Sequence, residues 1–356
     1  MKSLALALAF SLFIPAATQA AMPASDVIGQ AVEGFVRPAY GDLAEHAAAL
    51  ETAVEALCKT PSQDALDSAR AEFGQVAQSW SKVELIMFGP IREGNRLERL
   101  LFWPDRKSIG LKQVQAALAA KDPDAADADR IAGKSVAMQG FGALEYVLFG
   151  TDSGQLAGSE GAYRCSFGAA VAGNIAAVSA EVRDAWNRTD GFAAIWGSPG
   201  PDNPVYRNGS EAVTELMGVF INGLEMVRDV RLRGFLGSRP EKDKPKQALY
   251  WRSQGTTASL AANLEGLHGL FRASHLTDAL SPEARWIAES IEIQLTNGAE
   301  AARSVQGPVE EVLADPARRE KLDYYGTVTS SLSNLFGVRL SGEFGLTAGF
   351  SSLDGD

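Results

Sequence analysis

The chain has 356 residues, a hydrophobic share of 46% and a formal net charge of −11. This length predicts one large or two moderate domains, and the hydrophobic share is ordinary for a globular protein. Because the chain is acidic and has no basic block, we expect neither nucleic acid nor an anionic membrane surface as a partner. A cation or a cationic ligand is compatible with the charge.

The first twenty residues have the pattern of a secretory signal peptide. One early cation, Lys2, precedes an apolar run from Leu4 to Ile14, and small residues follow Pro15 up to Ala20. The run is too short to span a bilayer in the mature protein, and the small residues suit signal peptidase. We expect an exported protein, cleaved near Ala20, with no membrane span in the rest of the chain.

The two cysteines, Cys58 and Cys165, allow a single intramolecular disulfide. An even number of cysteines in an exported protein favours such a bond. It would join the end of a predicted helix, 27–59, to a helix that begins near Tyr163. Two free thiols are the alternative, because sequence alone does not give the geometry.

The next predicted helix, 62–88, has an acidic residue on an apolar face. Trp80, Glu84 and Met87 share this face at helical spacing. A carboxylate among apolar side chains is costly unless it is paired or bound to a cation. Glu84 is therefore a candidate binding residue.

The segment 92–106 is rich in arginine and ends in a turn. Arg92, Arg96 and Arg99 recur at helical spacing, and the turn contains Trp103 and Asp105. The planar fork of arginine binds a carboxylate through two bonds, so the three arginines are candidate partners for buried carboxylates. A solvated helix face is the common alternative for such a run.

The stretch 135–150, SVAMQGFGALEYVLFG, predicts a helix with one carboxylate in apolar surroundings, since Gly142 and Glu145 share an otherwise apolar stripe. Gly140 and Gly142 each cost about 1 kcal/mol relative to alanine in a helix interior. Such glycines commonly let another group approach the backbone closely. The pattern favours a binding site beside Glu145. The alternative is a tight helix crossing in which Glu145 pairs with an arginine.

Helical periodicity continues through the rest of the chain, and no alternating strand pattern occurs. The segment 197–209, GSPGPDNPVYRNG, contains three prolines and is the best candidate for a domain boundary. We therefore predict an all-α protein with two helical-bundle domains packed against each other, residues 21–196 and 210–356.

Several common catalytic patterns are missing from the sequence. The three histidines, His46, His268 and His275, do not form an HExxH motif. There is also no GxSxG elbow, no P-loop and no dinucleotide-binding glycine pattern. These absences weigh against the common zinc protease, serine hydrolase and nucleotide-binding classes.

Several segments together resemble the imelysin-like family of bacterial cell-envelope proteins, which is associated with iron uptake. Residues 140–150 are similar to its signature helix, in which a glycine, any residue, a histidine, two residues and a glutamate follow one another. Gly140 and Glu145 match this signature, and Gly142 stands in place of the histidine. The other matching segments are Trp80, 88–90, Arg99, 102–105 and 349–356.

This resemblance implies two helical-bundle domains, a site near their interface, a periplasmic or surface location and a link to iron. The family was named for a proteolytic activity, although its members are more often regarded as binding components. Gly142 removes the best neutral nitrogen ligand from any metal site. A site with only Glu145 and Glu84 would favour hard, oxygen-loving ions and bind them weakly, which makes a bound iron ion doubtful.

The favoured function is a non-enzymatic periplasmic binding or accessory protein linked to iron acquisition. Its partner would be a small ligand, a metal ion or a cell-envelope protein. The expected interface site comprises Gly140, Gly142, Glu145, Glu84, Arg92, Arg96, Arg99, Trp103 and Asp105. The alternatives are a metallopeptidase with Glu145 as base or ligand, and a structural or partner-binding protein with no ligand.

The positions of Glu84 and Glu145 relative to each other would discriminate between a metal ion and other ligands. If the oxygens of Glu84 and Glu145 converge on a void, a metal ion is favoured. If an arginine intervenes, a structural ion pair or an anionic ligand is favoured.

Overall fold

Every regular element in the described part of the chain is a helix. The structure, a computed structural model, describes residues 23–346 and contains no β-strand within that range. The all-α prediction is therefore confirmed. The predicted signal peptide, 1–20, and the terminal segment 349–356 lie outside the described residues.

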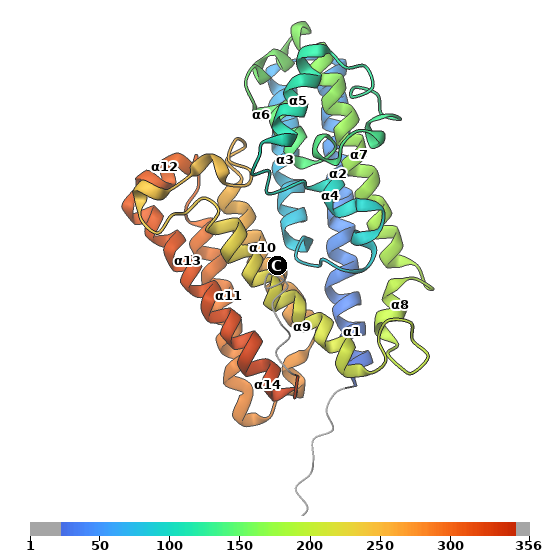
Figure 1. Cartoon of the computed structure of the whole chain (residues 1–356), viewed down its shortest axis with the longest axis vertical. Helices are drawn as coiled ribbons and strands as arrows, with labels where there is room; N and C mark the ends of the chain where they lie inside the picture. Colours follow the sequence, from blue (N-terminus) through green and yellow to red (C-terminus); the bar gives the residue numbers. More distant parts are fainter. Residues whose placement is uncertain (1–22, 347–356) are drawn as a thin grey trace, which may run out of the picture.

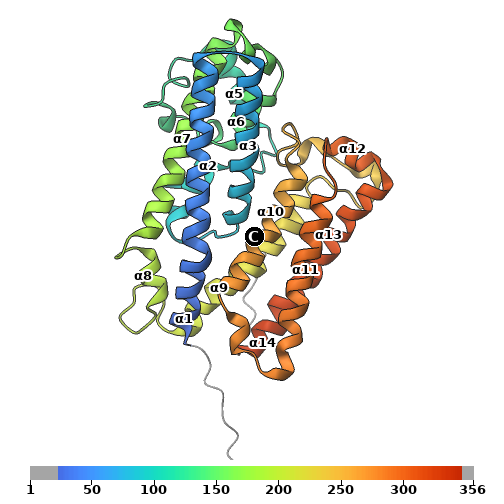
Figure 2. The ribbon, with the colours of Figure 1, turned by 180° about the vertical axis from the view of Figure 1, so that it is seen from behind.

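The first group of helices is arranged around α2, which packs against both α3 and α7 (Figures 1 and 2). A π-helical segment, Val32–Val36, joins α1 to α2 without a break. The predicted helix 27–59 is thus part of one continuous helix that spans residues 24–59. The group comprises α1 (Ala24–Ala31), α2 (Arg37–Lys59), α3 (Gln63–Val83), α4 (Arg96–Leu100), α5 (Ile109–Ala120), α6 (Phe141–Phe149), α7 (Ala162–Asn187) and α8 (Phe192–Gly197).

In the second group, α11 packs between α10 and α13, and α13 also contacts α9. Two π-helical segments, Met226–Leu232 and Leu335–Leu340, continue α9 and α13. The group comprises α9 (Gly209–Glu225), α10 (Thr256–Ala273), α11 (Arg285–Arg303), α12 (Val309–Ala314), α13 (Pro316–Asn334) and α14 (Ser341–Glu343). The segment 197–209 connects α8 to α9 (Figure 1). The division into two domains at this segment stays a prediction.

The two groups meet where α3 crosses α10. A Cβ placed on Gly266 of α10 would lie 2.7 Å from the carbonyl carbon of Lys82, so the two backbones approach closely. Asn263 donates from Nδ2 to the carbonyl oxygen of Ser81 at 2.7 Å and thereby satisfies a carbonyl at the end of α3. The helix predicted over 62–88 therefore ends at Val83, against α10.

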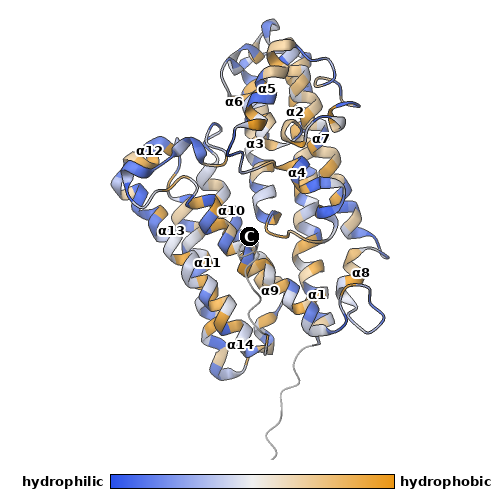
Figure 3. Cartoon of the chain, viewed as in Figure 1, coloured by the Kyte–Doolittle hydropathy of each residue, from blue (hydrophilic) through white to orange (hydrophobic). Residues whose placement is uncertain are grey.

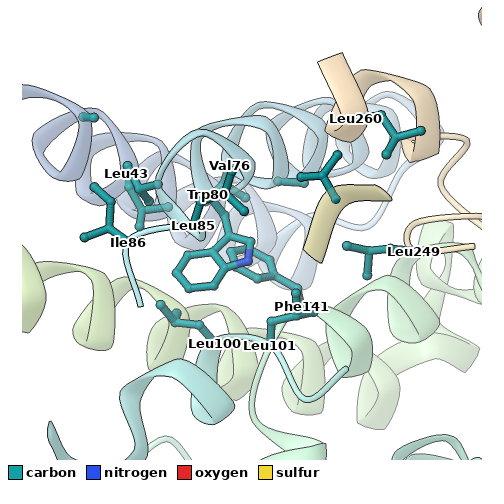
Figure 4. Close-up of a cluster of buried hydrophobic side chains, with 14 of the residues drawn as sticks. Leu43, Val76, Trp80, Leu85, Ile86, Leu100, Leu101, Phe141, Leu249 and Leu260 are labelled. Carbon is teal, nitrogen blue, oxygen red and sulfur yellow. The ribbon is translucent and has the colours of Figure 1, made fainter. Parts of the chain in front are cut away.

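The hydrophobic core runs through this crossing. Trp80 lies among Leu43 and Val76 from its own group and Leu249 and Leu260 from the second half of the chain (Figure 4). Phe141, the first residue of α6, contacts Trp80 with ring centroids 6.0 Å apart. The signature helix is therefore anchored in the same apolar layer that holds the two groups together.

Helix α7 is a central helix of the first group. It belongs to a run, Ser159–Gly197, that is long and apolar enough to cross a membrane, and 67% of the most apolar window of this run is buried in the protein. From the sequence we expect no membrane span after the leader, and this run nevertheless has the length and composition of one. A buried core helix has the same composition, because it is apolar on most faces. By contrast, a helix such as α13 carries both hydrophilic and hydrophobic residues along its length (Figure 3).

A disulfide joins Cys58 to Cys165, as the cysteine count predicted. It links the end of α2 to the start of α7, which pack along each other. The bond closes a loop with a sequence separation of 107 residues. The first group is therefore covalently fixed at the end where α6 also lies (Figure 1).

Candidate functional site

The signature helix starts later than the sequence predicted. Residues 136–138 form a short 3₁₀ turn, and α6 begins only at Phe141, with Gly140 as its N-cap residue in an extended conformation. The reason is steric. A Cβ on Gly140 would lie 2.5 Å from the carbonyl oxygen of Arg99 and closer still to that of Leu100. Gly140 thus lets the end of α4 press against the start of α6.

Gly142 has a different environment, because a Cβ there would meet no heavy atom within 4 Å.

The contrast between the two glycines can be tested. We expect Gly140→Ala to lower the free energy of unfolding by about 1–3 kcal/mol, since the α4 backbone must move. Gly142→Ala is the matched control and should change it by less than about 1 kcal/mol, in the stabilising direction. Urea denaturation of both variants measures this difference. Equal effects would contradict the assigned steric role of Gly140.

The open space beside Gly142 belongs to a cavity of about 630 Å³ between the two helix groups. The first half of the chain contributes residues from 101–111 and 137–146, and the second half contributes residues from 229–234 and 244–252. Four of the predicted site residues line this cavity: Trp103, Asp105, Gly142 and Glu145. Its lining does not include the other five, which are Gly140, Glu84, Arg92, Arg96 and Arg99.

Glu145 is buried, with 5% of its surface exposed, and the second half of the chain holds it in place. Its Oε1 accepts hydrogen bonds from the backbone N–H of Ser253 at 3.0 Å and from the Ser253 hydroxyl at 2.8 Å. Burial raises the pKa of Glu145, while these hydrogen bonds and the charge of Arg252 act in the opposite direction. The signature carboxylate therefore bridges the two helix groups at the cavity wall.

Glu84 lies away from the cavity in a buried ion pair. Its Oε2 binds Nη2 of Arg231, and its Oε1 accepts from Asn263 Nδ2 at 2.7 Å. Arg231 also stacks on the ring of Trp103, with its guanidinium carbon 4.3 Å from the ring centroid. Because Trp103 lines the cavity, this stack connects the cavity wall to the buried pair.

The charges of both acidic residues act on the buried side chain of Tyr250. Burial raises its pKa well above the ordinary value, and the charges of Glu84 and Glu145 raise it further, while that of Arg231 lowers it. The side chain is 1% exposed, and its hydroxyl has no hydrogen-bond partner in the described part of the protein. Tyr250, which lines the cavity, thus has a buried hydroxyl with no partner among the described residues.

The predicted pairing of the arginine run with Glu84 and Glu145 is wrong. Arg92 and Arg96 form ion pairs with other glutamates, and Arg99 donates to the side chains of Gln139 at 3.2 Å and Asn174 at 2.8 Å. The segment is not one continuous helix, because Gly94 and Asn95 both adopt positive φ angles and interrupt it. The arginines therefore do not share a face toward the carboxylates.

The arginines beside the two acidic residues come instead from the second half of the chain, as Arg231 and Arg252. Sequence reasoning did not single out either one. The sequence feature that could have drawn attention to Arg252 is its position between Trp251 and Ser253, just before a helix. Asp105 has a structural task, because its carboxylate accepts from the backbone N–H groups of residues 109–111 at the start of α5.

The donor set does not fit a bare metal ion. Within residues 23–346, no group of three or more histidine, cysteine, aspartate or glutamate residues is arranged to hold one. Glu84 is bound by Arg231 and Asn263, Glu145 by Ser253, and Gly142 supplies no ligand. Glu84 pairs with Arg231 and does not line the cavity with Glu145, and this arrangement favours a structural ion pair or an anionic ligand over a metal ion.

Comparisons with known proteins agree on one family. The sequence model of the family described as Peptidase_M75, Imelysin, matches residues 36–335. Iron-regulated protein A of Synechococcus elongatus is 22% identical over 306 residues, which cover 82% of this chain and 79% of that protein.

Two solved structures have a similar fold. An imelysin-like protein from Psychrobacter arcticum gives a TM-score of 0.74 at 18% identity, over 92% of this chain and 97% of that one. A proposed iron-regulated protein A precursor from Parabacteroides distasonis gives 0.73 at 15% identity, over 90% of this chain and 95% of that one. At these identities the two structures support the fold alone.

Proposed function

The chain belongs to the imelysin family, and from this premise we propose that it is a non-enzymatic binding or accessory component of iron acquisition, exported to the periplasm. Its ligand site is the cavity between the two helix groups, around Glu145. The observation that carries the proposal is that the position of the family histidine, Gly142, opens into this cavity beside the signature glutamate.

The link to iron rests on relatives. The Synechococcus protein is named as iron-regulated, and the Parabacteroides structure is described as the precursor of such a protein. The leader pattern in residues 1–20 supports export of this chain as well.

A binding role fits the chemistry of the cavity better than hydrolysis does. A metallopeptidase needs several protein ligands to a metal and a base near its bound water. The described residues supply no such ligand cluster, and Glu145 already accepts two hydrogen bonds from Ser253. By contrast, a cavity between two helix groups is a common position for a small-molecule site.

A ligand in this cavity would contact both halves of the chain. The wall from the first half contains α6 and the turn around Trp103, and the wall from the second half contains the segment before α10. Glu145 and Ser253 already link these walls. We expect binding to tighten this link, because a ligand that contacts both walls favours their bound arrangement.

Iron uptake by cells tests the proposal without knowledge of the ligand. The gene is deleted in the source bacterium, and uptake of radiolabelled iron is measured under iron limitation after complementation. Gly142→Phe places a phenyl ring in the cavity beside Glu145, whereas Gly41→Phe is the control, since Gly41 lies on α2 with open space around it. We expect wild type and Gly41→Phe to restore uptake, and Gly142→Phe to leave at most about a tenth of it.

Unchanged uptake in the deletion strain would refute the link to iron acquisition. Full restoration by Gly142→Phe would show that the cavity is not the site. Cleavage of casein by the purified protein, abolished by Glu145→Gln, would support the metallopeptidase alternative instead.

A further inference from the structure

We propose that the cavity takes a multiply charged organic anion, a polycarboxylate of the kind that chelates iron, through Lys244, Lys246 and Arg252, with the Tyr250 hydroxyl as an additional donor. This inference rests on the proposed function and names the class of ligand for the same site.

The cavity is more positively charged than the chain as a whole. The cavity lining contains five cationic side chains and three carboxylates, although the whole chain has a net charge of −11. The cations are Arg106, Arg233, Lys244, Lys246 and Arg252, and the carboxylates are Asp105, Asp229 and Glu145. A positive pocket in an acidic protein raises the local concentration of anions.

The carboxylates of the lining are already engaged. Asp229 binds Arg228 and Arg233, Asp105 accepts from backbone N–H groups, and Glu145 accepts from Ser253. None of the ion pairs found among residues 23–346 includes Lys244, Lys246 or Arg252. The positive charges of Lys244 and Lys246 are therefore available to a ligand, whereas that of Arg252 also acts on Glu145.

Two of these cations, Lys246 and Arg252, lie over aromatic rings. The guanidinium carbon of Arg252 lies 4.3 Å from the ring centroid of Trp251 and 5.4 Å from that of Tyr146. The ammonium nitrogen of Lys246 lies 5.8 Å from the centroid of the same Trp251 ring. Stacking on rings orients a cation while leaving its N–H donors free, so this wall is organised before a ligand arrives.

Tyr250 has a buried phenol hydroxyl. Tyr250 lines the cavity, yet its hydroxyl has no partner within the described residues, and a buried polar group without a hydrogen bond is unfavourable. Nε and Nη1 of Arg231, which stacks on the cavity residue Trp103, are also buried without partners. The unpartnered atoms of Tyr250 and Arg231 are thus buried hydrogen-bond donors at or behind this wall, and a ligand rich in acceptor oxygens that reaches them can satisfy them.

These features select against a bare cation. The available groups are positive charges and donors, whereas a metal ion requires acceptor ligands. An iron-bearing polycarboxylate brings its own oxygen ligands to the metal and presents negative charge to the protein. Such a ligand would carry iron without a protein histidine to bind the metal, which fits both the iron-regulated relatives and the glycine at position 142.

Calorimetric titration of the purified protein, without its leader, tests the inference. The probes are citrate, ferric citrate and aqueous Fe(II) as ferrous sulfate under anaerobic conditions. We expect citrate or ferric citrate to bind, with an affinity that falls as salt is raised, and Fe(II) alone not to bind. Saturable binding of Fe(II) without binding of either citrate probe would overturn the proposal.

Paired variants distinguish site charge from overall charge. Lys244→Gln/Lys246→Gln should weaken citrate binding by about tenfold, which corresponds to about 1.4 kcal/mol. The control Lys59→Gln/Lys121→Gln removes the same charge from residues outside the cavity lining and should leave affinity within about twofold. Equal losses in both double variants, or none in either, would overturn the assigned role of the lysines.

Tyr250→Phe tests whether the Tyr250 hydroxyl donates a hydrogen bond to the ligand. Since the hydroxyl has no partner in the protein, we expect this variant to keep its thermal stability while its citrate affinity falls at least about threefold. An unchanged affinity would remove Tyr250 from the ligand contacts. If the lysine variants bind citrate normally while Gly142→Phe still abolishes iron uptake, the anion inference fails and the proposed function stands.

Discussion

Replacing Arg231 with methionine is expected to lower the free energy of unfolding by about 3–5 kcal/mol. The substitution leaves the carboxylate of Glu84 buried, 3% exposed as a residue, without its counter-charge. Asn263 would still donate one hydrogen bond, but a neutral amide does not offset a buried charge. The Trp103 ring would also lose the cation stacked on it. Urea denaturation at pH 7 measures the loss as a lower midpoint.

Two further variants show whether this loss comes from an uncompensated charge. Arg233→Met removes a neighbouring, exposed arginine that pairs with Asp229, and we expect it to cost less than about 1 kcal/mol. The double variant Glu84→Gln/Arg231→Met removes both charges and should recover at least half of the loss. A single Arg231→Met variant as stable as wild type would contradict the buried pair between α3 and the continuation of α9.

Removing the disulfide is also expected to have a large effect: it should lower the free energy of unfolding by about 4–5 kcal/mol. Cys58 and Cys165 close a loop with a sequence separation of 107 residues, and a loop of that length strongly restricts the unfolded chain. Cys58→Ala/Cys165→Ala leaves small apolar side chains between α2 and α7 and should unfold at a clearly lower denaturant concentration. Reduced wild-type protein should have the same midpoint as this variant.

A thiol assay on the denatured, unreduced protein provides the control. We expect no reactive thiol, because both cysteines of the chain are in the bond. Two free thiols, together with equal stability of wild type and double variant, would show that the bond is absent from the protein in solution.

Much of the fold could be predicted from the sequence because the relevant signals are local. Apolar residues at helical spacing indicated the helices, and the cysteine count indicated the bond between Cys58 and Cys165. The cost of glycine in a helix and of a carboxylate among apolar residues drew attention to Gly140, Gly142 and Glu145. Even so, the helix start was misplaced, because the contact of Gly140 with Leu100 is not encoded in local spacing.

The sequence by itself determined that this protein is all-α and marked Glu145 as unusual, and it favoured a bond between the two cysteines that the structure then showed. Only the tertiary structure decided the partners of the two acidic residues: Glu84 binds Arg231, 147 residues away, and Glu145 binds Ser253, 108 residues away. The reason is that helical periodicity relates residues three or four positions apart, whereas these contacts arise where two separate groups of helices meet. The same packing encloses the cavity and places Lys244, Lys246 and Arg252 on its wall.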